Sequence, residues 1–414
     1  MKTKNIFNII IIIGFCLIIF LVPILTKIEK PAEYSIYENR NLAEAPVFSF
    51  EKIFKNPEED ASSWDIALGK YMASWDIYYS DHIFQRDKFL QFKNSIDIDF
   101  LKRPVVNEVI IQKNLLLPFN TYNIDNSEYP KEADWYAYVM SNLLSDLVKL
   151  VESYGGKFIY IGVPEQYSML REFYPEYLNN NDERLSMREH YFFTRLEEKN
   201  IDYINMRTEF NKTEDFIYYY SKTDHHYNLL GAFYSYQTLI NKLNEKYNAK
   251  VPMLTDDDIE FVKLNNPFYG SRNRKLYNRY NLDDKLYYYI NKKPVEFKRT
   301  DNGNKVTPFI FKLPDENDET TPVTYNIYMN GDIAETIIQT ERENLPNALL
   351  FGDSFTNPFE TFLYYSFNET RSLDMRHYKE STILEYIEKY KPDYVFCMRD
   401  DTAYFSFTGN GKIE

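Results

Sequence analysis

The pattern of hydrophobic and polar residues changes twice along the chain. An almost unbroken apolar run covers residues 6–26, which is long enough to cross the hydrocarbon core of a bilayer as a helix. Residues 31–60 are rich in proline and charge, which predicts an extended connector. Aromatic residues then recur at helical spacing from Trp64 to Tyr78, and a second helical stretch is expected over residues 86–98.

From about residue 101 onward, strand and helix patterns alternate. Strands are expected over residues 105–111, 157–163, 201–206, 347–351 and 393–398. Helices are expected over residues 132–154, 182–199, 229–247, 355–367 and 383–390. Between residues 252 and 345, short alternating runs such as 285–291 and 324–329 replace this rhythm and indicate a β-rich insertion. Strands that alternate with helices predict a mainly parallel sheet with helices on both faces.

The N-terminal run has the features of an uncleaved signal anchor. Lys2 and Lys4 precede it, and no small-residue cleavage site follows it. The positive end is expected to stay in the cytoplasm, although Lys27 and Lys30 reduce the charge asymmetry. The expected organisation is a cytoplasmic tail (1–5), a transmembrane anchor (6–26), an extracytoplasmic connector and helical region (27–100), and a catalytic domain (101–414) that holds the insertion at about 252–345.

Composition narrows the class of protein. The 414 residues include 48 Lys and Arg against 62 Asp and Glu, a formal charge of −14. This balance argues against a nucleic-acid partner, which requires a basic surface. Cys16 and Cys397 are the two cysteines, so neither a disulfide framework nor a cysteine-based metal site is expected. The 38 Tyr can offer amphipathic faces for sugars or partners, although codon bias is the favoured explanation for most of these tyrosines.

Two segments carry candidate chemistry because they follow strands or precede helices, where α/β proteins place their sites. The first is Gly352-Asp353-Ser354, directly after the strand expected at 347–351. A serine on such a turn exposes its hydroxyl, and its backbone N–H at a helix N-terminus can stabilise an oxyanion. An ordinary helix N-cap uses the same residue types, so this motif alone does not identify a nucleophile.

The second segment is Asp224-His225-His226-Tyr227, just before the helix expected at 229–247. A serine nucleophile needs a base, and histidine is the usual base near neutral pH. A carboxylate must then fix the imidazole tautomer. Asp224 and His226 suit these two roles, and His225 between them is expected to point the other way. Capping of the helix by Asp224 is the structural alternative.

A metal site is a further alternative, because Asp-His-His also occurs among ligands of phosphoesterases. A two-metal site needs several more carboxylates near strand ends. The acidic run Asp256-Asp257-Asp258 precedes an expected helix and has the character of an N-terminal cap cluster.

Several motifs together resemble the DHHW proteins, which are similar to the SGNH-hydrolase-like alginate O-acetylation proteins. Asp224-His225-His226-Tyr227 resembles the D-H-H-W motif, with Tyr227 in place of Trp. The other matching segments, in chain order, are Tyr37-Glu38-Asn39-Arg40-Asn41-Leu42-Ala43, Asp81-His82-Ile83-Phe84-Gln85-Arg86-Asp87, Gly352-Asp353-Ser354-Phe355 and Ser372-Leu373-Asp374-Met375-Arg376-His377-Tyr378. These matches run collinearly from about residue 35 to 400.

The resemblance implies an SGNH-hydrolase-like, flavodoxin-type fold and transfer or removal of O-acetyl groups on a polysaccharide outside the cell. Carried over by position, Ser354 is the nucleophile, His226 the base and Asp224 its partner. Asn357 and Gly352 are the candidate oxyanion or substrate contacts, and Gly331-Asp332 is a less favoured one. A sugar hydroxyl attacking acetyl-Ser354 makes a transferase, and water makes an esterase.

The resemblance also implies the partners of the chain. The acetyl donor is expected to be a multipass membrane acyltransferase, the acceptor a polysaccharide, and neither a metal nor a soluble cofactor is expected. A non-catalytic polysaccharide-binding or scaffold protein on the same fold is the remaining alternative.

Overall fold

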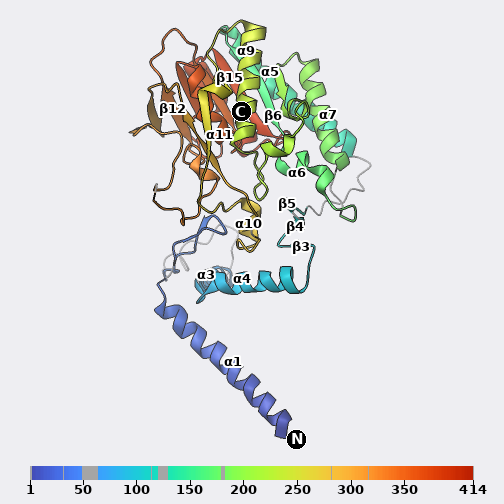
Figure 1. The fold of residues 1–414 in the computed structure, drawn as a ribbon, viewed down its shortest axis with the longest axis vertical. Coiled ribbons are helices and arrows are strands. Elements are labelled where there is room, and N and C mark those ends of the chain that lie inside the picture. Colours follow the sequence, from blue (N-terminus) through green and yellow to red (C-terminus); the bar gives the residue numbers. More distant parts are fainter. Residues whose placement is uncertain are drawn as a thin grey trace. The chain divides into compact units, whose positions relative to one another are not determined.

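The computed structural model describes most of the chain (Figure 1). The described residues are 2–30, 32–48, 64–112, 114–119, 129–178, 182–280, 282–315 and 317–413. The chain forms two compact units, which are treated separately below. The first comprises Met1–Asn107 and Asn273–Asn281, and the second comprises Glu108–Arg272 and Leu282–Glu414.

The first unit begins with the long helix α1 (Lys2–Ile28), which contains the predicted apolar run. Among the described residues, its segment Asn8–Ile28 is the one helical stretch long and apolar enough to cross a bilayer. The two predicted helical regions that follow are also present. The remaining elements are β1 (Tyr34–Ser35), β2 (Arg40–Asn41), α3 (Trp64–His82), α4 (Arg86–Ser95), the π-helical turn η1 (Ile96–Phe100) and β3 (Val105–Val106). Part of the expected connector at 31–60 lies outside the described residues.

The second unit is built around an eight-stranded sheet of order β11-β10-β12-β14-β13-β15-β6-β7. Strands β14, β13, β15, β6 and β7 are parallel, whereas β12, β10 and β11 extend one edge in antiparallel pairs. The bounds are β6 (Lys157–Val163), β7 (Tyr203–Asn205), β10 (Lys298–Asp301), β11 (Asn304–Val306), β12 (Glu335–Gln339), β13 (Ala348–Gly352), β14 (Glu369–Leu373) and β15 (Tyr394–Asp400). Two antiparallel strand pairs lie outside this sheet, the hairpin of β4 (Val109–Gln112) with β5 (Leu115–Pro118) and the pair of β8 (Ile259–Lys263) with β9 (Tyr287–Asn291).

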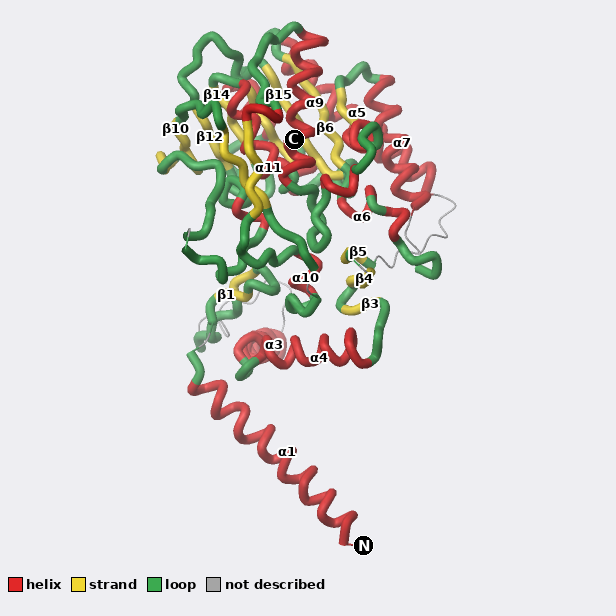
Figure 2. The backbone as a smooth tube through the Cα atoms, viewed as in Figure 1, coloured by secondary structure: helices red, strands yellow, loops and turns green. Residues whose placement is uncertain are grey.

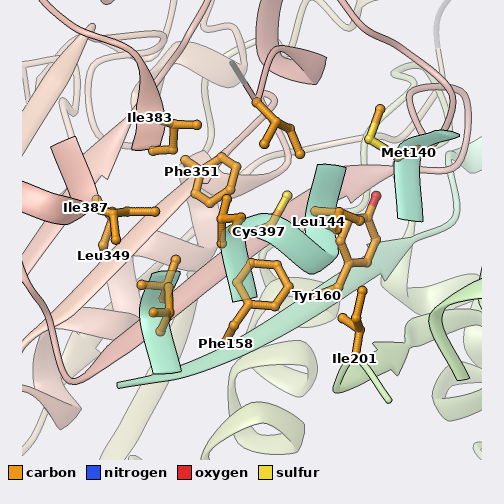
Figure 3. Close-up of a cluster of buried hydrophobic side chains, with 14 of the residues drawn as sticks. Met140, Leu144, Phe158, Tyr160, Ile201, Leu349, Phe351, Ile383, Ile387 and Cys397 are labelled. Carbon is orange, nitrogen blue, oxygen red and sulfur yellow. The ribbon is translucent and has the colours of Figure 1, made fainter. Parts of the chain in front are cut away.

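Helices cover both faces of this sheet (Figure 2), as the alternating pattern predicts. The helices of the second unit are α5 (Tyr129–Ser153), α6 (Gln166–Met169), α7 (Asp182–Glu198), α8 (Met206–Phe210), α9 (Leu229–Tyr247), α11 (Thr356–Leu363) and α12 (Ile383–Tyr390). The short helix α10 (Ser271–Lys275) has residues in both units. Alternate strand residues point to opposite faces. Phe158, Phe351 and Cys397 pack with α5, α7 and α12 in the buried cluster of Figure 3. Tyr394, on the other face, contacts Tyr247 of α9.

Four of the predicted elements are wrong in type or extent, each for a local reason. The run 105–111 is interrupted by Asn107 and Glu108, whose φ angles of 47° and 63° are left-handed. Residues 324–329 form the 3₁₀ turn η5 (Tyr325–Ile327) because Thr324 caps it. The acidic run forms the 3₁₀ turn η4 (Asp256–Asp258), and a strand rather than a helix follows it. The helix expected over 355–367 ends at Leu363 and continues as the 3₁₀ turn η6 (Tyr364–Ser366).

Candidate active site

The turn that leaves β13 lies at the carboxyl end of the parallel part of the sheet. Strand β13 lies between β14 and β15, which both follow it in the chain. The chain therefore moves to one side through α11 and returns past β13 through α12, and such a reversal of strand order creates a crevice at the strand ends. Ser354 lies in this turn and is partly exposed.

Close packing against β15 fixes the start of the turn. A Cβ atom at Gly352 would overlap the main-chain carbonyl of Met398, so only glycine fits there. Asp353 then holds the turn from within, because one carboxylate oxygen accepts the Phe355 N–H at 2.9 Å and the other accepts the Asp400 N–H at 2.6 Å. Burial and repulsion from the Asp400 carboxylate raise the pKa of Asp353 well above its usual range.

A second loop, ahead of α9, presents the Asp-His-His segment. Asn228 is the N-cap of α9, since its side chain accepts the N–H groups of Leu230 and Gly231. Asp224 is therefore not the cap that the structural alternative required. The Tyr227 hydroxyl donates to the Phe355 carbonyl at 2.6 Å and joins this loop to the turn after β13.

The two loops bring Ser354, His226 and Asp224 into one hydrogen-bonded chain. The Nε2 atom of His226 lies 2.7 Å from the Ser354 hydroxyl oxygen, and its Nδ1 atom lies 2.6 Å from Oδ1 of Asp224. Asp224 and His226 are 2% and 5% exposed, whereas Ser354 is reachable from solvent. Within the described part of the chain, the Ser354 N–H makes no hydrogen bond. This is the connectivity that a serine nucleophile and its base require.

Several contacts keep Asp224 ionised. Burial alone raises the pKa of a carboxyl group, but the adjacent imidazoles of His226 and His225 and the hydrogen bonds to the carboxylate hold the pKa of Asp224 well below its usual range. One of those bonds comes from the Ser271 N–H, which donates to Oδ2 at 2.6 Å. The carboxylate is therefore available to stabilise a positive charge on His226.

Sequence reasoning missed Ser271 and the loop that carries it. The preceding Gly270 lies against the main chain of Thr223 so closely that a Cβ atom would overlap it. The N–H and the hydroxyl group of the same Thr223 both donate to Oδ2 of Asp284, at 2.8 Å and 2.7 Å. The contact from Ser271 to Asp224 uses a main-chain N–H, which leaves no mark on the side-chain pattern of the sequence.

Tyr325 was also missed, and it covers the imidazole of His226. The two rings are stacked with centroids 3.8 Å apart and planes 8° apart. Tyr325 is 6% exposed, so its ring excludes water from one face of His226. The segment was expected to be a strand, and no motif marks it.

The expectation that His225 points away from this pair is wrong. Its ring lies against that of His226, with centroids 3.6 Å apart, and its Nδ1 atom lies 2.8 Å from the Ser271 hydroxyl oxygen. The ligand atoms of Asp224, His225 and His226 lie within 4.8 Å of one another, close enough to share a metal ion. In this structure both nitrogens of His226 are already used by Asp224 and Ser354.

The candidate oxyanion contacts lie on either side of Ser354. Gly352 is in the last position of β13. Asn357 is in the first turn of α11 and is 6% exposed, and its Nδ2 atom donates to Asp332 at 3.0 Å. One N–H of this amide is therefore already used, and the role of both residues stays a prediction. Asp332 also pairs with Arg376 at 2.7 Å.

A mainly parallel sheet with helices on both faces and Ser354 at the end of its central strand makes this an SGNH-hydrolase-like fold. Comparison with solved structures agrees. PatB1 of Bacillus cereus, solved with a sulfonyl adduct, aligns with a TM-score of 0.60 and 23% identity over 74% of this chain and 98% of its own. A DHHW family protein from Eubacterium siraeum aligns with a TM-score of 0.52 and 17% identity over 73% and 93%.

The O-acetyltransferase domain of AlgJ from Pseudomonas putida aligns more distantly, with a TM-score of 0.43 and 11% identity over 72% of this chain and 92% of its own. No model of a known protein family matches the chain, and no curated protein matches it. At 23% and 17% identity, the likeness to PatB1 and to the DHHW family protein is one of fold. It agrees with the resemblance to the DHHW proteins that the sequence motifs indicate.

Proposed function

We propose that this chain is a membrane-anchored, extracytoplasmic O-acetyltransferase that modifies a polysaccharide. The observation that carries the proposal is the hydrogen-bonded chain from Ser354 through His226 to Asp224 at the carboxyl end of the central strand. The shared fold with PatB1, for which a sulfonyl adduct has been observed, supports an acyl-transfer type of chemistry. The apolar helix α1 fits a single-pass anchor.

The reaction has two halves. In the first, the Ser354 oxygen attacks the acetyl carbonyl of the donor, His226 takes the hydroxyl proton at Nε2, and the donor's leaving group departs with that proton. In the second, a sugar hydroxyl gives its proton to His226 and attacks acetyl-Ser354. The ester bond to Ser354 then breaks, and its oxygen takes the proton back. The free Ser354 N–H, near the start of α11, is the first candidate donor to the oxyanion in both halves.

A multipass membrane acyltransferase is the proposed acetyl donor, and the acceptor is a polysaccharide that leaves the cell. Polysaccharide acetylesterase activity follows from the same residues when water replaces the sugar. Acetylated glycan and free acetate, measured in one reaction with an activated acetyl ester as donor, separate these activities. Transfer exceeding hydrolysis in the presence of glycan supports the acetyltransferase.

Covalent labelling tests the nucleophile directly. An arylsulfonyl fluoride should add one sulfonyl group to Ser354, located by peptide mass spectrometry, and should abolish hydrolysis of a chromogenic acetate ester. Ser354→Ala should lose both the label and the activity. Ser381→Ala is the matched control, because this partly buried serine bonds to the Thr382 carbonyl and to the Tyr378 side chain, neither of which belongs to the proposed triad. Full turnover by the Ser354→Ala variant would refute the proposal.

A further inference from the structure

In the first unit, helix α4 and the turn η1 bury polar side chains and expose apolar ones. This is the opposite of what is expected at the surface of a water-soluble protein. The face turned toward the unit includes Asn94 and Asp97, which are 1% and 6% exposed. The outer face carries Phe92 and Phe100, which are 65% and 82% exposed. A helix at a water-exposed surface normally buries its apolar stripe and presents its polar residues to solvent.

Two hydrogen bonds reach polar side chains of the inner face, although the Nδ2 atom of Asn94 makes none with the described residues. The Gln91 amide donates to the Tyr37 hydroxyl at 3.0 Å, and the Asn107 amide donates to Oδ1 of Asn94 at 3.1 Å. These bonds fix the rotation of α4 about its own axis. The apolar side chains therefore cannot be turned inward without leaving buried polar groups unpaired.

The exposed apolar residues form one stripe at helical spacing. Phe89, Phe92, Ile96 and Phe100 are separated by three, four and four residues and are 57%, 65%, 39% and 82% exposed. Residues at this spacing share one side of a helix. These four residues are called the apolar stripe below.

The end of the candidate membrane helix is hydrogen-bonded to the turn that starts α4. The Phe84 N–H donates to the Thr26 hydroxyl at 2.9 Å, and the Gln85 N–H donates to a carboxylate oxygen of Glu29 at 3.4 Å. Thr26 is the last residue of the apolar run. The first turn of α4 is thereby held where α1 would leave the bilayer.

We propose that the apolar stripe lies in the interfacial region of the membrane and holds the first unit on the bilayer surface. An amphipathic helix in this position buries its apolar face among the headgroups and upper acyl chains. Residues 86–100 contain three basic and three acidic side chains, so apolar contact rather than headgroup charge would hold the helix. The contact should therefore persist at high salt.

Fluorescence quenching in vesicles tests this with the full chain. The protein is reconstituted in phosphatidylcholine vesicles, and bimane is attached at Phe92→Cys or Phe100→Cys in a Cys16→Ser background, since Cys397 is buried. Lys305→Cys, at an exposed position of the second unit, is the water-accessible control. Nitroxide lipids labelled near the headgroup or near the chain end report depth.

Emission from positions 92 and 100 should shift to the blue and be lost mainly with the shallow nitroxide, at low and high salt alike, while position 305 stays unquenched. Emission from positions 92 and 100 that matches position 305 would overturn the inference. So would shielding that arises only with a co-reconstituted acyltransferase, or only as protein concentration rises, because a protein partner would then cover the stripe.

The inference rests on the anchor part of the proposed function and not on its chemistry. Bimane on the native Cys16, within α1, reports on the anchor separately and should be quenched mainly by the chain-end nitroxide. Quenching at Cys16 without quenching at positions 92 and 100 leaves the anchor standing and removes the stripe. No quenching at any of the three positions removes both.

Discussion

Asp224→Asn gives the sharpest test of the proposed triad, because the structure shows what each side-chain oxygen does. Oδ1 accepts the His226 Nδ1–H and the His226 main-chain N–H, and Oδ2 accepts the Ser271 N–H. An amide has one oxygen and one NH₂ group. Either orientation of the new side chain therefore places an N–H group against another hydrogen-bond donor, and neither keeps the negative charge.

The lost charge sets the size of the effect. In the transition state His226 carries a proton from Ser354, and the Asp224 carboxylate lies next to it. Two unit charges about 4 Å apart interact by about 4 kcal/mol at an effective dielectric constant of about 20. Loss of that interaction corresponds to about a 10³-fold fall in kcat. An amide turned so that its NH₂ faces Nδ1 would also stabilise the wrong imidazole tautomer and enlarge the loss.

Asp284→Asn is the matched control in the same loop. One oxygen of Asp284 accepts both bonds from Thr223, so an amide oxygen can replace it. Burial raises the pKa of Asp284 to about 6, so the substitution removes little charge when the assay is run below that pH. The assay compares kcat for acetate ester hydrolysis and the thermal unfolding midpoint of both variants. Loss of less than about tenfold in Asp224→Asn, a difference of about 1.4 kcal/mol, would refute the charge argument.

Three further changes test neighbouring features. His226→Ala should lower activity by orders of magnitude and His225→Ala much less, whereas equal losses together with inhibition by a chelator would favour the metal alternative. Tyr325→Phe should keep activity, because the stacked ring is retained, and Tyr325→Ala should lower it by opening His226 to water; equal activities would mean that the stack has no role. Burial raises the pKa of Glu360 from 4.5 to about 7. The protonated Glu360 therefore contributes fully to the free energy of unfolding below about pH 4.5. This contribution, about 3 kcal/mol, is lost as the pH rises through 7. The thermal unfolding midpoint of Glu360→Gln should therefore rise relative to that of the parent chain between about pH 5 and pH 8. A difference between the two midpoints that does not change with pH would contradict this.

The sequence predicts elements well where local signals define their ends. Strand β6 follows Gly155-Gly156 and stops before Pro164, and helix α9 starts after the Asn228 cap; both have the expected bounds. The triad segments could be proposed because each follows a strand or precedes a helix. Ser271 and Tyr325 could not, since one acts through its main chain and the other depends on tertiary packing. Pairing of β10 to β12 with the main sheet is likewise non-local.

Strand β13 has a consequence for how the protein becomes active during its synthesis. Its two neighbours, β14 and β15, are both made after it, and Met398 and Asp400 of β15 bond to the turn that carries Ser354. Contacts between distant parts of a chain form only when both parts are present. The turn that carries Ser354 therefore lacks this support until β15 (Tyr394–Asp400) has emerged. Any activity at Ser354 would then begin only once β15 has paired with β13.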